Sequence, residues 1–203
     1  MSATLYQRDL PSRISLGPVV AVDTETMGLD PARDPLCLVQ LSGGDGSAHM
    51  VQFDRAAYDA PNLKRLLADE NVLKIFHFAR FDMAMIARYL DVTCQPVYCT
   101  KIASKLARTY TDKHGLKDLV REFLGIDMSK QQQSSDWGSG DLSDAQLAYA
   151  AADVLHLHAI KARLDDMLAR EDRMELAKAC FEFLPARARL DLRGWAGEDI
   201  FSH

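Results

Sequence analysis

One stretch of the sequence, residues 19–29, constrains the fold more than any other: it reads Val-Val-Ala-Val-Asp-Thr-Glu-Thr-Met-Gly-Leu. Four consecutive apolar residues predict a strand that is buried on both faces, as in the centre of a sheet. Asp23 and Glu25 follow two residues apart, and because strand side chains alternate between faces, both carboxylates should project from the same side. Two negative charges this close repel each other unless a cation lies between them, and oxygen ligands suit Mg²⁺ or Mn²⁺. A strand that ends in two solvated acids is the alternative, so the rest of the chain must decide.

The composition is typical of one globular domain. The chain has 203 residues, of which 48% are hydrophobic and 26% charged, enough for a sizeable core. We expect a single domain over residues 1–203, with a core at about 15–170 and a C-terminal helix and tail at about 171–203. The first residues contain no apolar signal segment, no apolar run approaches the ~18 residues of a membrane helix, and the four cysteines form no C-x-x-C pair. We therefore expect a cytoplasmic protein with reduced thiols and no membrane partner.

The formal net charge of −5 bears on the kind of substrate. A protein that grips long nucleic acid through many phosphates is usually basic. An acidic chain can still act on phosphodiesters if bound metal ions supply positive charge locally, and it would then suit short substrates. The net charge alone does not choose between these cases.

The predicted elements follow the order of a mixed α/β sheet. The predicted strands begin at Val19 and cover residues 36–41, 48–53, 72–78 and 97–99. The predicted helices cover residues 62–69, 82–90, 101–108, 116–124, 144 to about 169 and 174 to about 189. Ser143 is a good N-cap and Gly125 a good helix end. Three strands in meander order at the start exclude a doubly wound Rossmann sheet.

Two further acidic positions come later in the chain. Asp82 lies at the entrance to a predicted helix, where its ordinary role would be to cap that helix or to interact with the positive end of the helix dipole. Tyr149 and Asp153 are four residues apart and share one helix face, and the three alanines between them would let the helix approach a strand closely. An acid that faces a sheet is costly unless it is paired or bound to a metal. The alternative is a packed tyrosine beside a solvent-facing aspartate.

Together these motifs resemble the three exonuclease motifs of the DEDD superfamily, tyrosine branch: Asp23-x-Glu25, then Asp82, then Tyr149-x-x-x-Asp153. The resemblance covers residues 15 to about 170. The intervening segments 36–42, 99–104 and 135–137 are similar to the exonuclease domain of ribonuclease D. With its compact length and Met27-Gly28-Leu29 after the first motif, the chain most resembles the nanoRNase C family of small bacterial 3′–5′ exoribonucleases. One departure is His77, which stands where the second motif usually opens with Asn.

The resemblance implies an RNase H-like (DnaQ-like) fold with a mixed five-stranded sheet flanked by helices, in a homo-oligomer for which an octamer is expected. It implies that four acids hold two Mg²⁺ or Mn²⁺ ions, which would activate a water molecule and stabilise the departing 3′-oxygen. Asp23 would bridge the ions, and Glu25, Asp82 and Asp153 would complete the set. Tyr149 would orient the attacking water, since a phenol with an ordinary pKa near 10 is a poor base unless the metals lower that pKa.

The resemblance also implies substrate contacts. Leu29 would wedge between the last two bases, the backbone of Thr26, Met27 and Gly28 would meet the terminal sugar, and His77 or Phe81 would stack on a base. For Leu29 the alternative is a minor core residue, and for Phe81 it is simple burial. The basic residues nearest the predicted site are candidates for holding a 5′-phosphate, and the sequence does not choose among them: Arg80, Arg108, Lys113 and Lys130.

The function that the resemblance implies is metal-dependent 3′–5′ hydrolysis of short RNA, dinucleotides included, to nucleoside 5′-monophosphates. An exonuclease of DNA, or of longer structured RNA such as tRNA precursors, would share every metal ligand and is the first alternative. A catalytically silent nucleic-acid-binding module is the second, although all four acids and the tyrosine are present.

Overall fold

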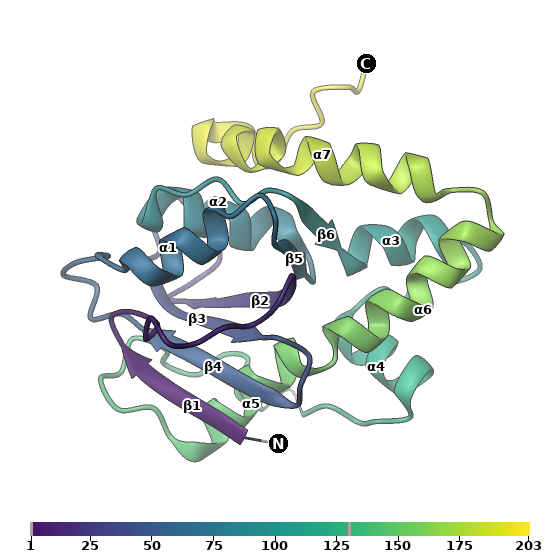
Figure 1. Cartoon of the computed structure of the whole chain (residues 1–203). Helices are drawn as coiled ribbons and strands as arrows, with labels where there is room; N and C mark the ends of the chain where they lie inside the picture. The colour runs from purple at the N-terminus through teal and green to yellow at the C-terminus, as the bar shows by residue number, and fades with distance from the viewer. Residues whose placement is uncertain (1, 130) are drawn as a thin grey trace.

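The structure is a computed structural model that describes residues 2–129 and 131–203, and its centre is a mixed sheet (Figure 1). The strands lie in the order β1-β4-β3-β2-β5-β6. Their bounds are β1 Ser2–Gln7, β2 Val19–Thr26, β3 Leu36–Ser42, β4 Ser47–Gln52, β5 Leu73–Phe76 and β6 Val97–Cys99. β2 pairs antiparallel with β3 and parallel with β5, and the remaining pairs extend the sheet on both sides. The mixed α/β class expected from the order of elements is therefore confirmed.

Strand β2 is central because its apolar run has no side that faces solvent. Val20, Ala21 and Val22 are completely buried. Residues 19–21 pair with β5, and residues 21–26 pair with β3. The acids that follow the apolar run are consequently carried by a strand that is buried and held in the sheet by β3.

The sheet has six strands, so the expected number of five is wrong. The additional strand, β1, pairs in parallel with β4 at the edge of the sheet. Its residues are exposed or half-buried throughout. An edge strand of this kind carries no continuous apolar run, and its partner lies more than 40 residues away, so the local pattern did not reveal it.

The helices are α1 Pro61–Ala68, α2 Ala79–Leu90, α3 Thr100–Ala107, α4 Leu116–Leu124, α5 Asp144–Leu155, α6 Leu157–Arg170 and α7 Met174–Leu190, with a π-helical turn at Asp191–Trp195. The helix expected from residue 144 to about 169 is in fact two helices, which separate at His156. No Gly or Pro marks this break, and the helical spacing of apolar residues continues across it, so the sequence pattern predicted one helix. Helix α2 begins at Ala79 rather than at Asp82, and the cap position is Phe78, so the capping role considered for Asp82 is wrong.

Helices cover both faces of the sheet (Figure 1). Helix α5 packs across β1 to β4 on one face, and α2 packs against β2, β3 and β5 on the other. Helix α7 lies over α2 and also contacts α3 and β6. Within the described part of the chain, no helix has both the length and the apolar character needed to cross a membrane.

Candidate active site

Asp23 and Glu25 project from β2 toward the side on which α5 packs. They are half-buried, whereas Thr24 between them points to the opposite side and is 7% exposed. The pairing of β2 with β3 shifts register between Glu25 and Thr26, so the regular strand ends just beyond the two acids. The alternation expected from the sequence thus places both carboxylates together at the end of a buried strand.

Asp153 completes a group of three carboxylates. One oxygen each from Asp23, Glu25 and Asp153 can be chosen so that all three lie within 4.8 Å of one another. Helix α5 approaches the sheet closely at this point because Ala150 and Ala151, on its inner side, are buried and small. The alternative of a solvent-facing Asp153 is therefore excluded.

Asp82 reaches the same region from the other face of the sheet. It is 4% exposed, and its Oδ1 accepts a hydrogen bond of 2.6 Å from the Thr24 hydroxyl. Asp82 lies outside the group of three carboxylates, yet it is close enough to raise the pKa of Asp23 by charge repulsion. The structure thus brings three of the four predicted acids into one group and places the fourth directly behind β2.

Burial and mutual repulsion dominate the electrostatics of these acids. Desolvation, followed by repulsion from Asp82 and Asp153, holds the pKa of Asp23 well above its usual range. Burial, followed by charge repulsion from Asp153 and Asp82, raises the pKa of Glu25 to about 9. Burial raises the pKa of Asp82 to about 7, although the hydrogen bond from Thr24 partly lowers it. Burial likewise raises the pKa of Asp153 to about 7, and hydrogen bonding by Tyr149 partly offsets it.

This donor set fits divalent cations. The carboxylates offer hard oxygen ligands only, which is what Mg²⁺ and Mn²⁺ prefer. Burial disfavours the ionised form of these carboxylates, and among the described residues no Lys or Arg lines the cavity around them to offset it. A bound cation would supply positive charge and let all the carboxylates ionise at neutral pH.

Tyr149 lies beside the acids on α5. Burial, followed by the negative charge of Asp153, raises the pKa of the Tyr149 phenol far above its usual value near 10. Its hydroxyl therefore keeps its proton at neutral pH and is suited to donating a hydrogen bond rather than to acting as a base. The ring of Trp137 lies 6.1 Å from that of Tyr149, centroid to centroid, and helps to fix its position.

Asp23, Glu25, Tyr149 and Asp153 line a cavity of about 520 Å³. Residues predicted to contact substrate also line this cavity: Thr26, Met27, Gly28, Leu29, His77 and Phe81. The Leu29 side chain is 87% exposed, so the alternative of a core leucine is excluded, and Phe81 is only half-buried. Gly28 has no room for a side chain, since a Cβ there would lie 2.1 Å from Oδ2 of the buried Asp34. That close approach fixes the loop that presents Leu29.

His77 is held in one tautomer by its partners. Its Nδ1 lies 2.9 Å from the Thr100 hydroxyl, which itself donates to the carbonyl of Phe76 at 3.1 Å. The hydroxyl proton is thus committed, so Nδ1 must donate, which leaves Nε2 as an acceptor. Burial, with the charge of Lys101, lowers the pKa of His77 to about 3. His77 is accordingly neutral at physiological pH.

The basic residues considered for a 5′-phosphate do not line the cavity. Arg108 is completely buried and forms an ion pair with Glu122, and Arg80 binds both carboxylate oxygens of Asp191. Lys113 is exposed but lies outside the cavity, and Lys130 falls outside the described residues. Complete burial excludes Arg108 as the phosphate-binding residue, whereas Arg80 and Lys113 lie outside the cavity lining and stay hypotheses. Among the described residues, the cavity lining contains no Lys or Arg.

Two supporting residues were missed in the sequence. Thr24 holds Asp82, and Thr100 holds His77. For Thr24 a signal existed, because a residue between two acids of a strand must face the opposite side, from which Asp82 approaches. For Thr100 there was none, since its partner lies 23 residues earlier in the chain.

Comparison with known proteins gives consistent matches. The family model described as 3′-5′ exonuclease matches residues 7–169. Ribonuclease D of Gluconacetobacter diazotrophicus is 36% identical over 165 residues, which is 80% of this chain and 41% of that protein, so the chain spans about two fifths of this curated relative. The predicted resemblance to ribonuclease D is thereby confirmed.

Two solved structures match along the whole chain. The structure named Brucella melitensis NrnC with bound Mg2+ has a TM-score of 0.96 and 52% identity, and the match covers 100% of both chains. The structure named Brucella melitensis NrnC bound to pGG has a TM-score of 0.97 and 53% identity, and it covers 100% of this chain and 99% of that one. These likenesses support the expected RNase H-like fold.

Proposed function

The chain belongs to the 3′-5′ exonuclease family, and from this membership we propose that it is a metal-dependent 3′–5′ exoribonuclease that releases nucleoside 5′-monophosphates from short RNA, dinucleotides included. The observation that carries the proposal is the group of three carboxylates from β2 and α5, with Asp82 directly behind it. The choice of a short RNA is supported by the match along the whole chain to Brucella melitensis NrnC. One of its structures is described as containing bound Mg2+, and another as bound to pGG.

In this proposal Asp23, Glu25 and Asp153 hold two divalent cations, Mg²⁺ or Mn²⁺, and Asp82 completes the site. When bound, such ions would neutralise charge on the scissile phosphate and favour attack by water at neutral pH. The contribution of the chain is to fix the carboxylates on a buried strand and a closely packed helix, so that little rearrangement is needed on binding. Thr24 keeps the Asp82 carboxylate in one orientation through its 2.6 Å hydrogen bond.

Tyr149 orients the attacking water molecule by donating its phenolic proton. Burial and the nearby carboxylates raise its pKa, which favours the protonated phenol as a hydrogen-bond donor over a role as the base. Its position beside Asp153 places the hydroxyl at the edge of the carboxylate group.

The substrate would lie along the rest of the cavity. Leu29 presents an apolar side chain to solvent and would insert between the last two bases, which offsets the cost of its exposure. The backbone of residues 26–28 would meet the terminal sugar. Phe81 and the neutral His77 would offer faces for a base to stack on.

A homo-oligomer, with an octamer as the expected form, and a cytoplasmic location remain part of the proposal. The location is supported by four cysteines that are free in the structure, three of them buried. Light scattering of the purified protein tests the oligomeric state.

The function is tested by hydrolysis of a 5′-phosphorylated RNA dinucleotide with Mg²⁺, Mn²⁺ or a chelator, followed by chromatography of the products. We expect nucleoside monophosphates with either ion and none with the chelator. Asp23→Asn should lower the rate by at least about 100-fold, since it removes one of the negatively charged oxygen ligands of the bound ions. Glu182→Gln, an exposed acid on α7, serves as the matched control and should keep its activity.

Parallel reactions with longer RNA and duplex DNA separate the proposal from its first alternative. Preferential hydrolysis of DNA would contradict the choice of RNA. Protein that is inert toward every substrate with both ions would support a silent binding module instead.

A further inference from the structure

Gln40, on β3, is a buried side chain whose amide makes no hydrogen bond. It is completely buried, and neither its Nε2 nor its Oε1 has a partner among the described residues. A buried amide without hydrogen bonds costs the fold free energy, so buried amides are nearly always paired. The unpaired amide of Gln40 therefore calls for a partner that it meets in another state of the protein.

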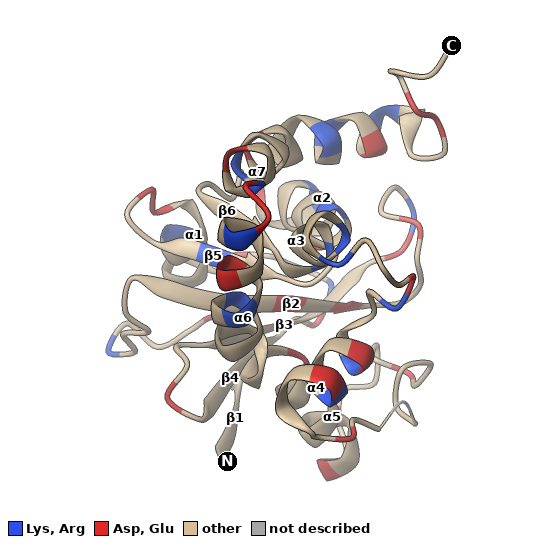
Figure 2. Cartoon of the chain, turned by 90° about the vertical axis from the view of Figure 1, so that its right-hand side faces the viewer, with Lys and Arg blue, Asp and Glu red and all other residues tan. Residues whose placement is uncertain are grey.

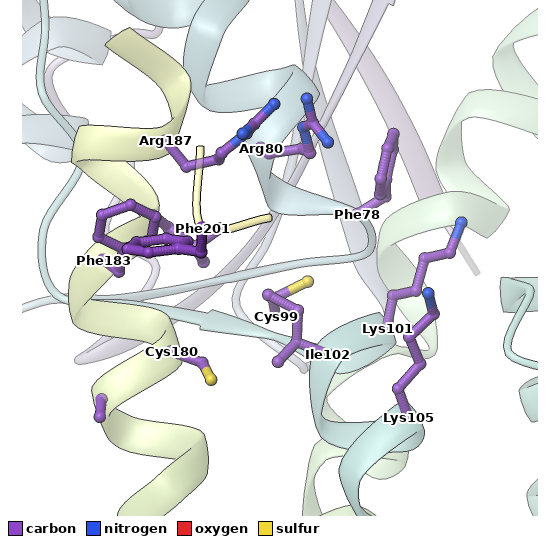
Figure 3. A pocket seen from close by; sticks show the side chains of 12 residues that line it. Phe78, Arg80, Cys99, Lys101, Ile102, Lys105, Cys180, Phe183, Arg187 and Phe201 are labelled. Atoms are coloured by element: carbon purple, nitrogen blue, oxygen red, sulfur yellow. The ribbon is translucent and has the colours of Figure 1, made fainter. Parts of the chain in front are cut away.

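Comparable polar side chains of the molecule are paired. Gln52, on β4, is 4% exposed, and its Nε2 and Oε1 each take part in a hydrogen bond of 2.9 Å. Arg80 and Arg187 line a cavity between α3 and α7 (Figure 3), and both bind the carboxylate of Asp191. Gln40 differs from these side chains because both polar atoms of its amide are unpaired.

Gln40 lies directly beside the first acid of the candidate active site. In the antiparallel pairing of β2 with β3, Gln40 is the partner of Asp23. Residues paired in this way project their side chains from the same face of the sheet, with Cβ atoms about 4.5–5.5 Å apart. Strand β3 carries no charged residue, whereas β2 carries two acids (Figure 2). The Gln40 amide is thus the polar group that β3 presents to Asp23.

The elements packed around Gln40 offer its amide few other partners. The buried residues of α5, which covers this face of the sheet, are Gln146, Ala150, Ala151 and Val154. Three of them are apolar, and both ends of the Gln146 amide are engaged in hydrogen bonds at the start of α5. On its other side, Gln40 is paired with Met50 of β4, which is apolar as well. Asp23 is therefore the acceptor that lies directly opposite the unpaired amide.

We propose that Gln40 is a positioning residue for Asp23: when Asp23 holds the divalent cations, Nε2 of Gln40 donates a hydrogen bond to its carboxylate. The inference rests on the proposed function, because it takes Asp23 as a ligand of the cations. Carboxylates that bind metals are commonly oriented by such hydrogen bonds. Thr24 already orients Asp82 in this way from the opposite face of the sheet, and Gln40 does the same for Asp23.

The test compares Mn²⁺ binding by Gln40→Met and by the wild-type protein in calorimetry. Methionine is unbranched like glutamine and has no hydrogen-bond donor. We expect the Kd for Mn²⁺ to rise roughly 10- to 100-fold, the usual effect of removing the partner of a metal-binding side chain. The Mn²⁺ concentration that half-saturates hydrolysis of a dinucleotide should rise in parallel. At saturating Mn²⁺ the KM for the dinucleotide should be unchanged, since Gln40 does not line the catalytic cavity.

Thermal unfolding separates positioning of Asp23 from packing of the core. In a chelator the midpoint of Gln40→Met should not fall, because the substitution removes an unpaired amide rather than a hydrogen bond. Mn²⁺ should then raise the midpoint of the variant less than that of the wild type. Gln52→Met, at a paired glutamine on the same face of the sheet, is the matched control. It should lower the midpoint in the chelator and leave the affinity for Mn²⁺ unchanged.

An unchanged affinity of folded Gln40→Met for Mn²⁺ would overturn the inference. If the variant does not fold, or is less stable than the wild type in the chelator, crystals of the wild-type protein with Mn²⁺ decide. The inference requires Nε2 of Gln40 within hydrogen-bond distance of an Asp23 oxygen, and an amide bonded to another group or to water alone would contradict it. Wild-type protein that neither binds Mn²⁺ nor hydrolyses the dinucleotide would refute the proposed function itself, and this result is obtained without any Gln40 variant.

Discussion

Replacing Asp153 with asparagine should make the metal-free protein more stable at alkaline pH. Burial raises the pKa of Asp153 from 3.8 to about 7, so its proton is held more tightly in the folded than in the unfolded state. A carboxyl group with a raised pKa contributes stability below its unfolded pKa and loses that contribution as the pH rises through the folded value. Wild-type protein in a chelator should therefore become less stable between about pH 4 and pH 8, whereas the asparagine cannot ionise.

The size of the effect follows from the same shift. At about 1.4 kcal/mol for each tenfold change in proton affinity, the ionised Asp153 costs the fold on the order of 4 kcal/mol at pH 8. For a chain of this length we expect Asp153→Asn to raise the thermal midpoint by roughly 5–15 °C in the chelator. The assay is thermal unfolding followed by circular dichroism at pH 4 and pH 8, with chelator or with Mg²⁺. At pH 4 the two proteins should unfold at nearly the same temperature.

Mg²⁺ should reverse the order at pH 8, because the cation stabilises the wild-type carboxylates and binds the variant less well. Glu182→Gln removes an exposed acid on α7 and should leave the midpoint almost unchanged in every condition. The reasoning would be refuted if Asp153→Asn were less stable than wild type in the chelator at pH 8, or if Mg²⁺ stabilised both proteins equally.

The other predictions concern one surface and one buried residue. Leu29→Ala should change the free energy of unfolding by less than about 0.5 kcal/mol, since Leu29 is 87% exposed. The same substitution should lower kcat/KM for a dinucleotide. An unchanged kcat/KM would contradict a role of Leu29 in substrate binding. Arg108→Met should destabilise the fold by roughly 1–3 kcal/mol in urea unfolding, because it leaves the carbonyl of Lys113 without its donor and removes the partner of Glu122, which is itself exposed. A loss well below about 1 kcal/mol would show that Arg108 contributes little to stability.

Local patterns in the sequence predicted the parts of the site that local structure determines. The alternation of β2 placed Asp23 and Glu25 on one side, and the helical spacing of Tyr149 and Asp153 placed both on one face of α5. Two helix ends, at Ser143 and Gly125, also followed their capping residues. Ser143 forms a reciprocal capping box with Gln146 at the start of α5, and α4 ends at Gly125 in the left-handed region, with φ 69°.

The features that the sequence did not predict depend on partners far apart in the chain. Strand β1 exists because β4 offers an edge to it. Arg80 looked available for a phosphate, but Asp191, which binds it, comes 111 residues later. The burial of Arg108 likewise depends on how α3 and α4 pack, which periodicity within either helix does not specify.

Diffraction from crystals grown or soaked with Mn²⁺ tests the central claim most directly, since the anomalous signal locates the ions without reference to activity. The account predicts two peaks among the carboxylates of Asp23, Glu25, Asp82 and Asp153, and none there in Asp23→Asn crystals at the same Mn²⁺ concentration. Wild-type crystals with no peak between these carboxylates, from protein that hydrolyses short RNA with Mn²⁺, would contradict it.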